Sequence, residues 1–241
     1  MTSALTIDGH VATLSLEGPL DADRVAELGG FSDQIAGDAS VRACVLRAAS
    51  EIWAGWSEDA LAGAEQQGLV GDPFGAFASL PQATVAVLAG QVQDAGLELA
   101  LCADIRVAGP ETMLGLPSAA ASLPIAGGLQ RLSRAVGRAR ALELVLTGAP
   151  IDAPMARAWG LLSSVVDDAA GEGESLAGRI AERGPIAVRF AKEAVRRGIE
   201  MPLEQALRFE TDLTVLLQTT ADRAEGVAAF AEKRAPTFRG E

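Results

Sequence analysis

Histidine and cysteine are scarce in this chain. Of its 241 residues, one is a histidine, His10, and two are cysteines, Cys44 and Cys102. A Ser-His-Asp or Cys-His triad would have to use His10, which falls at a predicted hairpin turn where solvated polar side chains are typical. Paired histidines, a C-x-x-C pair and acidic clusters with ligand spacing are absent, so the sequence predicts no metal site. Catalysis would therefore have to rest on carboxylates and backbone amides.

Long apolar runs and a basic surface are lacking as well. No stretch of about 18 apolar residues free of charge occurs, and residues 1–18 do not show the basic start and apolar block of a secretion signal. Both cysteines lie in apolar runs, as expected for buried thiols in a reducing compartment. We therefore expect a cytoplasmic protein without a membrane partner. A formal net charge of −12 argues against a nucleic-acid partner, but it leaves room for a small anionic ligand.

The first two thirds of the chain alternate strand and helix patterns. Residues 4–16 predict a β-hairpin around Asp8-Gly9. Three apolar runs are predicted strands: residues 41–47, 84–88 and 105–108. Three segments have helical spacing: residues 21–36 with a possible break at Gly29-Gly30, residues 57–67, and one that opens near Gly96. This alternation favours an α/β domain with a mainly parallel sheet.

The last third is predicted to be mostly helical. The candidate helices are residues 153–159, 175–183, 185–197, 202–218 and 222–233. Pro185 and Pro202 stand where a proline in the first turn is tolerated. The glycine-containing residues 171–175 predict a short loop. The chain is accordingly divided into a core, residues 1–185, and a C-terminal helical region, residues 186–241.

The most informative stretch lies between Thr84 and Leu132. A predicted strand leads into a turn of small residues at 94–96, and a helix begins near Glu98. Small residues let the backbone approach a ligand closely, and the first amides of a helix offer unpaired donors to a developing anion. Glu98 either supplies a carboxylate beside that anion or only complements the dipole of its own helix.

Five segments together resemble the crotonase (enoyl-CoA hydratase/isomerase) superfamily. The sequence ELALCADIRVA is similar to the family signature E-L-A-x-x-C-D-I-R-x-A, with cysteine and alanine exchanged in order. The segments occur in the family's order and cover essentially the whole chain. They are VRACVLR at 41–47, AGW at 54–56, ELALCADIRVA at 98–108, PIAGGLQRL at 124–132 and FAEKRAPTF at 230–238.

The resemblance implies both a fold and a ligand. The implied fold is α/β: a crotonase (ClpP-like) spiral of ββα units, followed by a C-terminal α-helical region that mediates trimerisation. The implied ligand is an acyl-CoA thioester, with coenzyme A as part of the substrate and no other cofactor. The implied assembly is a homotrimer or hexamer. Members of the family stabilise a thioester enolate, as enoyl-CoA hydratases do in fatty acid metabolism.

The resemblance also assigns catalytic positions. The backbone amides of Trp56 and Ala95 match the two donors of the family's oxyanion hole, and each such donor can contribute about 10²–10³ in rate. Glu98 matches the first catalytic glutamate of the hydratases. Ser118 occupies the position of the second, where losing an acid–base group typically costs about 10²–10⁴ in rate. Ala126 occupies the position of the extra aspartate of dienoyl isomerases and dehalogenases, which disfavours those activities.

Further positions are expected to contact the substrate or shape its pocket. The substrate-binding candidates are Ala54, Ser57, Gly96, Pro117 and Lys233, with the adenine and phosphates near Ala54 and Lys233. The bulky Trp56 is expected to narrow the acyl pocket. Asp94 replaces a glycine of the family's turn, and its side chain is expected to point to solvent.

Several functions remain open from the sequence. The first is an enoyl-CoA hydratase-like lyase or isomerase with Ser118 in place of the second glutamate. The second is decarboxylation of a malonyl-type thioester, which needs the oxyanion hole but not that glutamate. The third is a non-catalytic acyl-CoA-binding protein, and the weakest is an α/β protein without a coenzyme A site.

Overall fold

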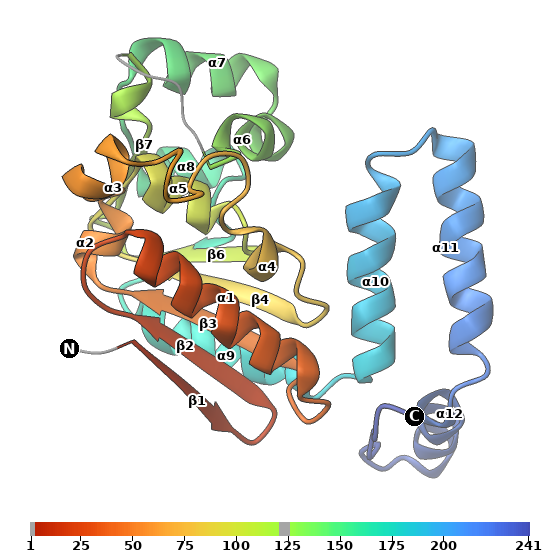
Figure 1. The fold of residues 1–241 in the computed structure, drawn as a ribbon. Coiled ribbons are helices and arrows are strands. Elements are labelled where there is room, and N and C mark those ends of the chain that lie inside the picture. Colours follow the sequence, from red (N-terminus) through yellow and green to blue (C-terminus); the bar gives the residue numbers. More distant parts are fainter. Residues whose placement is uncertain (1–2, 121–125) are drawn as a thin grey trace.

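A six-stranded sheet lies at the centre of the computed structural model, which describes residues 3–120 and 126–241 (Figure 1). Its strand order is β1-β2-β3-β4-β6-β9. The strands are β1 (Ala4–Asp8), β2 (Val11–Leu16), β3 (Ala43–Ala48), β4 (Ala83–Leu88), β6 (Ile105–Ala108) and β9 (Ser164–Val165). β1 and β2 form the predicted antiparallel hairpin, and every other neighbouring pair is parallel.

A second, smaller sheet has three strands. It consists of β5 (Gln91–Gln93), β7 (Met113–Gly115) and β8 (Ile151–Asp152). β5 runs parallel to β7, with Gln93 opposite Gly115. The two strands therefore end side by side. The chain continues from β5 into Asp94 and from β7 toward Pro117-Ser118. Strands of two or three residues are too short to show a periodic pattern, so the sequence did not indicate them.

Helices cover both faces of the main sheet. The helices of the core are α1 (Ala22–Gly37), α2 (Ser50–Trp53), α3 (Glu58–Ala62), α4 (Gly75–Ala78), α5 (Asp94–Ala100), the 3₁₀ turn η1 (Pro117–Ala120), α6 (Gly128–Val136), α7 (Arg138–Thr147), α8 (Ala153–Ala158) and α9 (Ala169–Ala181). Leu46 belongs to the cluster on the α1 and α5 side, whereas Val45 belongs to the cluster beneath α9. Such burial on both faces is typical of a central parallel strand and explains its continuous apolar run.

Two glycine-containing segments differ from the predictions. α1 begins after its N-cap Asp21 and runs unbroken through Gly29-Gly30. Residues 171–175 were predicted to be a loop, which is wrong, because they lie inside α9. A Cβ at Gly173 would lie 2.5 Å from Cγ2 of Val87, so this glycine lets α9 lie directly on the sheet. Close packing has overridden the low helix propensity of glycine.

Three helices extend from the core as a C-terminal arm (Figure 1). They are α10 (Pro185–Gly198), α11 (Leu203–Leu217) and α12 (Ala221–Glu232). The Nζ atom of Lys192 on α10 lies 2.6 Å from Asp104 Oδ2 and donates to the Gln82 carbonyl at 2.8 Å, which ties the arm to the core. The predicted division between residues 185 and 186 falls at the start of α10 and stays a prediction.

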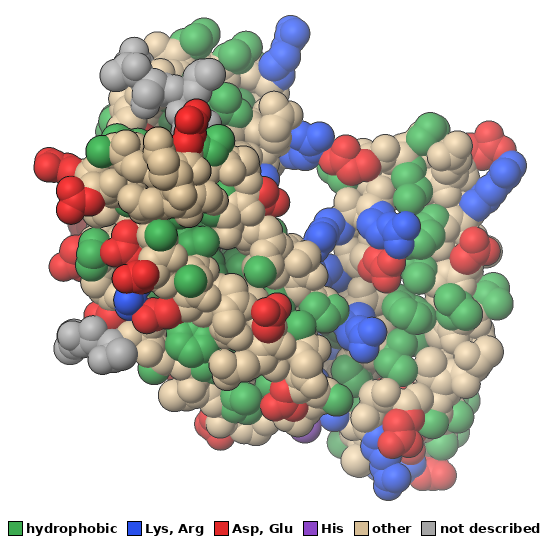
Figure 2. Space-filling view, in the orientation of Figure 1, with side chains coloured by type: hydrophobic (Ala, Val, Ile, Leu, Met, Phe, Trp, Pro, Cys, Tyr) green, Lys and Arg blue, Asp and Glu red, His purple; other side chains and the backbone are tan. Residues whose placement is uncertain are grey.

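Apolar side chains are exposed along this arm (Figure 2). They include Val195, Ile199, Leu203, Leu207, Val215, Leu216, Val227 and Phe230, the last of which is 88% exposed. Only Leu213 is buried on α11, and α10 has no buried residue. Within the described parts of the chain, no helix combines the length and apolarity needed to cross a membrane.

Candidate active site

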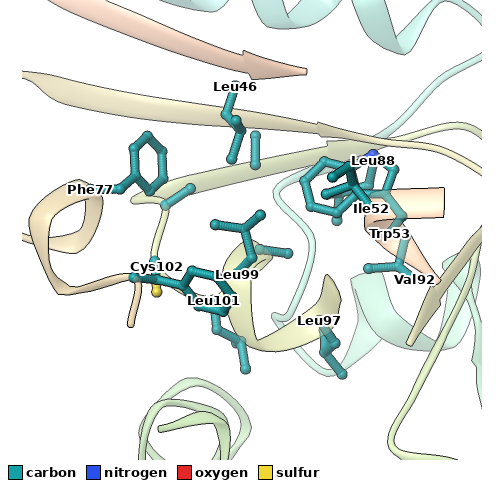
Figure 3. Packing of buried hydrophobic residues seen from close by; sticks show 14 of the residues in the cluster. Leu46, Ile52, Trp53, Phe77, Leu88, Val92, Leu97, Leu99, Leu101 and Cys102 are labelled. Carbon is teal, nitrogen blue, oxygen red and sulfur yellow. The ribbon is translucent and has the colours of Figure 1, made fainter. Parts of the chain in front are cut away.

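α5 begins the candidate site and lies tightly against α2. A Cβ at Gly96 would lie 2.1 Å from the carbonyl oxygen of Trp53, so only glycine allows the two helices this approach. Leu97 and Leu99 of α5 belong to the buried apolar cluster that also contains Trp53 and Val92 (Figure 3). This packing fixes the position of every polar group that α5 carries.

The backbone of Gly55-Trp56 lies beside the first residues of α5. A Cβ at Gly55 would lie 3.6 Å from the Ala95 nitrogen and 3.3 Å from the Gln93 carbonyl oxygen. Ala95 is the second residue of α5, where no carbonyl of the same helix can accept from its amide. The structure thus brings together the two segments whose amides were predicted to form the oxyanion hole. The oxyanion hole itself stays a prediction.

The Trp56 side chain packs against the core. Its ring stacks on buried Phe74 with ring centroids 5.6 Å apart and an angle of 16° between the ring planes. The indole Nε1 is buried and has no hydrogen-bond partner among the described residues. The ring is partly buried, and stacking on Phe74 holds it in place. That Trp56 narrows the space available to an acyl chain stays a prediction.

The Glu98 carboxylate lies at the start of α6. The side chain is 1% exposed, and its Oε1 accepts from the Ala126 amide at 3.1 Å and from the Gly128 amide at 2.8 Å. A Cβ at Gly128 would lie 2.3 Å from Glu98 Cγ, so this glycine makes room for the glutamate. α5 begins at Asp94, two residues earlier than expected, so Glu98 is not in its first turn. The interpretation that Glu98 complements the dipole of its own helix is therefore wrong.

Burial raises the pKa of Glu98 above the ordinary glutamate value of 4.5. Desolvation of the carboxylate is the largest cause, and the negative charge of Asp94 acts in the same direction. The amides of Gly128 and Ala126 and the positive charge of Arg131 oppose the rise. A glutamate with a raised pKa exchanges its proton closer to neutral pH, as a general acid or base requires.

The raised pKa of Glu98 predicts how stability depends on pH. Above an ordinary pKa of 4.5, the native state holds the Glu98 proton more tightly than the unfolded state does. The free energy of unfolding must therefore fall as pH rises from that value through the raised native pKa, and then level off. Glu98→Gln should lack this fall. We expect the variant to gain stability relative to the wild type over that interval in urea titrations at a series of pH values. Parallel curves would contradict the raised pKa.

Ser118 and Asp94 are in contact at the N-terminus of α5. The Ser118 amide donates to Asp94 Oδ1 at 3.0 Å, and its hydroxyl donates to Oδ2 at 2.7 Å. The expectation that the Asp94 side chain points to solvent is therefore wrong, because both of its oxygens are engaged by Ser118. Asp94 also adopts a left-handed backbone with φ of 46°, a conformation that aspartate tolerates better than most residues. The sequence indicated neither contact, because their partners are 24 residues apart.

The other predicted site residues fall into two groups. Gly96 and Pro117 lie beside the Asp94 and Ser118 pair, whereas Ala54 is exposed at the end of α2. Ser57 caps α3, its hydroxyl oxygen accepting from the Ala60 amide at 3.2 Å. Lys233 ends α12 on the arm, well away from α5 (Figure 1).

Arg131 and Asp72, which are not among the predicted site residues, support the site. Arg131 donates to the Asp72 carboxylate at 2.7 Å and to the Ala126 carbonyl at 3.2 Å, and so braces the segment that holds Glu98. Pro124 and Ile125 of the PIAGGLQRL segment lie outside the described residues. Within the described residues, no group of histidine, cysteine, aspartate and glutamate side chains has the arrangement of a metal site.

Comparison with known proteins assigns the family. The sequence profile of the enoyl-CoA hydratase/isomerase family matches residues 6–241. The chain belongs to the enoyl-CoA hydratase/isomerase family. The crystal structure of an enoyl-CoA hydratase from Bacillus anthracis superposes with a TM-score of 0.93 and 32% identity, over 100% of both chains. Both the predicted membership of the crotonase superfamily and the predicted fold are thereby confirmed.

Curated relatives of the family are similar over part of their length. The probable enoyl-CoA hydratase echA8 of Mycobacterium tuberculosis is 41% identical over 168 residues, which are 68% of this chain and 65% of that protein. The human mitochondrial methylglutaconyl-CoA hydratase is 40% identical over 172 residues, 68% of this chain and 51% of that protein. The match thus spans between half and two thirds of the length of these relatives.

Proposed function

We propose that this chain binds an acyl-CoA thioester and acts as an enoyl-CoA hydratase-like lyase that stabilises a thioester enolate. The observation that carries the proposal is the buried Glu98 carboxylate, whose pKa is raised and which lies on the helix that also presents the Ala95 amide. Family membership supports the same reaction class.

The proposed reaction adds water across the double bond of a 2-enoyl thioester. The water oxygen bonds to the β-carbon, and the electrons of the double bond move onto the thioester carbonyl as an enolate. The amides of Trp56 and Ala95 would donate to that developing oxyanion, where each preformed donor is worth about 10²–10³ in rate. Glu98 would exchange the proton that the α-carbon gains. No cofactor beyond the coenzyme A of the substrate enters this scheme.

One observation favours a second candidate function. Ser118 stands where hydratases of the family carry their second glutamate, and a hydroxyl cannot exchange protons near neutral pH as a carboxylate does. Decarboxylation of a malonyl-type thioester needs enolate stabilisation without that glutamate. Binding of acyl-CoA without catalysis is the third possible outcome.

The arm supports the proposed assembly. Exposed apolar side chains along α10 and α11 favour packing against further copies in a homotrimer or hexamer. Lys233 lies far from Glu98 of its own chain, so it would have to bind the phosphates of a coenzyme A held by a neighbouring copy. Ala54 and Ser57 would line the coenzyme A path. A cytoplasmic location stays a prediction.

The proposed function is tested by incubating the protein with crotonyl-CoA and, separately, with methylmalonyl-CoA. We expect loss of the conjugated thioester absorbance with crotonyl-CoA and no release of CO₂ from methylmalonyl-CoA. Release of CO₂ alone would replace hydration by decarboxylation. Binding of both thioesters, measured by calorimetry, without any turnover would refute both reactions and leave a binding protein.

A further inference from the structure

The carboxylate of Asp94 lies beside Ser118, the position at which this chain lacks the second glutamate. Ser118 replaces the second glutamate, yet its amide and hydroxyl both donate to Asp94, at 3.0 and 2.7 Å. The pairing of β5 with β7 sets Gln93 opposite Gly115, and this register carries Asp94 and Ser118 into contact. The missing acid at position 118 is thus matched by an additional acid that reaches the same place from α5.

Asp94 and Glu98 are the two carboxylates of α5. A Cβ at Gly55 would lie 3.3 Å from the Asp94 Cβ, so Asp94 lies beside the segment that carries the Trp56 amide. Leu97 and Leu99 of the same helix belong instead to the buried apolar cluster (Figure 3). The two carboxylates are close enough for the charge of Asp94 to raise the pKa of Glu98.

Each carboxylate is held by different groups. The amides at the start of α6 bind Glu98, whereas Ser118 binds Asp94. Asp94 is also half-buried and holds a left-handed backbone conformation that a glycine would adopt without strain. Non-glycine residues in this region concentrate at functional sites, where the surrounding contacts hold them in place.

We propose that Asp94 is the second catalytic carboxylate of the hydration and that Ser118 positions it. This inference rests on the hydratase function proposed above. Asp94 takes a proton from the water whose oxygen bonds to the β-carbon, and protonated Glu98 gives its proton to the α-carbon. Asp94 has then gained one proton and Glu98 has given one up. Proton transfer from Asp94 to Glu98, directly or through water, restores the starting state. The net reaction adds one water to the enoyl thioester.

The test moves the carboxylate between the two positions. Asp94→Asn keeps the size and the tolerance of a left-handed backbone, and we expect its kcat for crotonyl-CoA hydration to fall by about 10²–10⁴-fold while acyl-CoA still binds. The double variant Asp94→Gly, Ser118→Glu restores the family's arrangement and should recover most of the activity. Asp33→Asn, an exposed aspartate on α1, is the matched control and should be unaffected.

Ser118 is tested as the positioning residue. Ser118→Ala removes the hydroxyl but keeps the hydrogen bond from the backbone amide of residue 118 to Asp94. We therefore expect kcat to fall on the order of 10-fold with little change in KM. Ser118→Thr keeps a hydroxyl and should restore kcat. A fall in kcat that threonine does not rescue would refute this role.

The outcomes separate the two proposals. If the wild type hydrates crotonyl-CoA and Asp94→Asn does so equally well, Asp94 is not catalytic and the hydratase function stands. If only the double variant is active, Asp94 cannot replace the glutamate, and both the inference and the wild-type hydratase function fail. If neither the wild type nor the double variant hydrates crotonyl-CoA although each binds acyl-CoA, the two proposals are likewise overturned.

Discussion

Glu98→Gln is expected to lower the rate of crotonyl-CoA hydration by about 10²–10⁴-fold, the usual cost of losing one acid–base group. Glutamine keeps an oxygen that can accept from the Ala126 and Gly128 amides, so the start of α6 and the packing of α5 should be preserved. The variant removes proton exchange and leaves the oxyanion donors in place. Binding of acyl-CoA should therefore change little, and the loss should appear in kcat.

The measurement is a steady-state assay with crotonyl-CoA, paired with calorimetric titration of the product thioester. Glu182→Gln is the matched control, because this exposed glutamate ends α9 and is remote from α5 (Figure 1). Turnover by Glu98→Gln at the wild-type rate would show that the Glu98 carboxylate does not exchange the proton. A loss of binding as large as the loss of rate would show that it only holds the site together.

The overall fold could be predicted because its signal is spread over the chain. Segments at both ends and in the middle resemble one family, and the long apolar strands have clear patterns. The short strands β5 and β7 carry no such pattern, although their pairing determines what meets at the site. Helix α9 was partly misread because glycine is a poor helix former, whereas Gly173 is required for its contact with Val87.

The candidate site could be predicted only in part, for a similar reason. Glu98 lies in a motif that occupies consecutive residues, so its position follows from the sequence. Its hydrogen-bond partners, the amides of Ala126 and Gly128, are 28 and 30 residues away in the sequence. Only the packing of the start of α6 against α5 brings them to the carboxylate. The direction of Asp94 does not follow from the local sequence, because its hydrogen-bond partner Ser118 is 24 residues away. Contacts between distant segments therefore supplied what local patterns could not.

Gly96→Ala is expected to lower the free energy of unfolding by about 3 kcal/mol, at the upper end of the cost of overpacking. The added Cβ would lie 2.1 Å from the Trp53 carbonyl oxygen and 2.7 Å from its Cα. Both atoms belong to the backbone of α2, so no side-chain rotation can relieve the contact. Equilibrium unfolding in urea measures the loss. A variant as stable as the wild type would contradict the close approach of the two helices.

Gly29→Ala is the matched control for this substitution. Gly29 also lies inside a helix, but a Cβ there meets no atom within 4 Å. The same change should therefore stabilise the protein by about 0.5–1 kcal/mol, because alanine loses less backbone entropy than glycine does. Opposite signs for the two variants would separate close packing from helix propensity.

Relief of the contact at Gly96 also has a consequence for activity. α5 must move away from α2, and it carries Asp94, Ala95 and Glu98 with it. A displacement of about 1 Å can cost about 10²-fold in rate when reacting groups must be aligned. The remaining folded protein should thus hydrate crotonyl-CoA far more slowly than the wild type, when rates are compared per folded molecule. Wild-type turnover by the folded fraction would mean that α5 does not position the reacting groups.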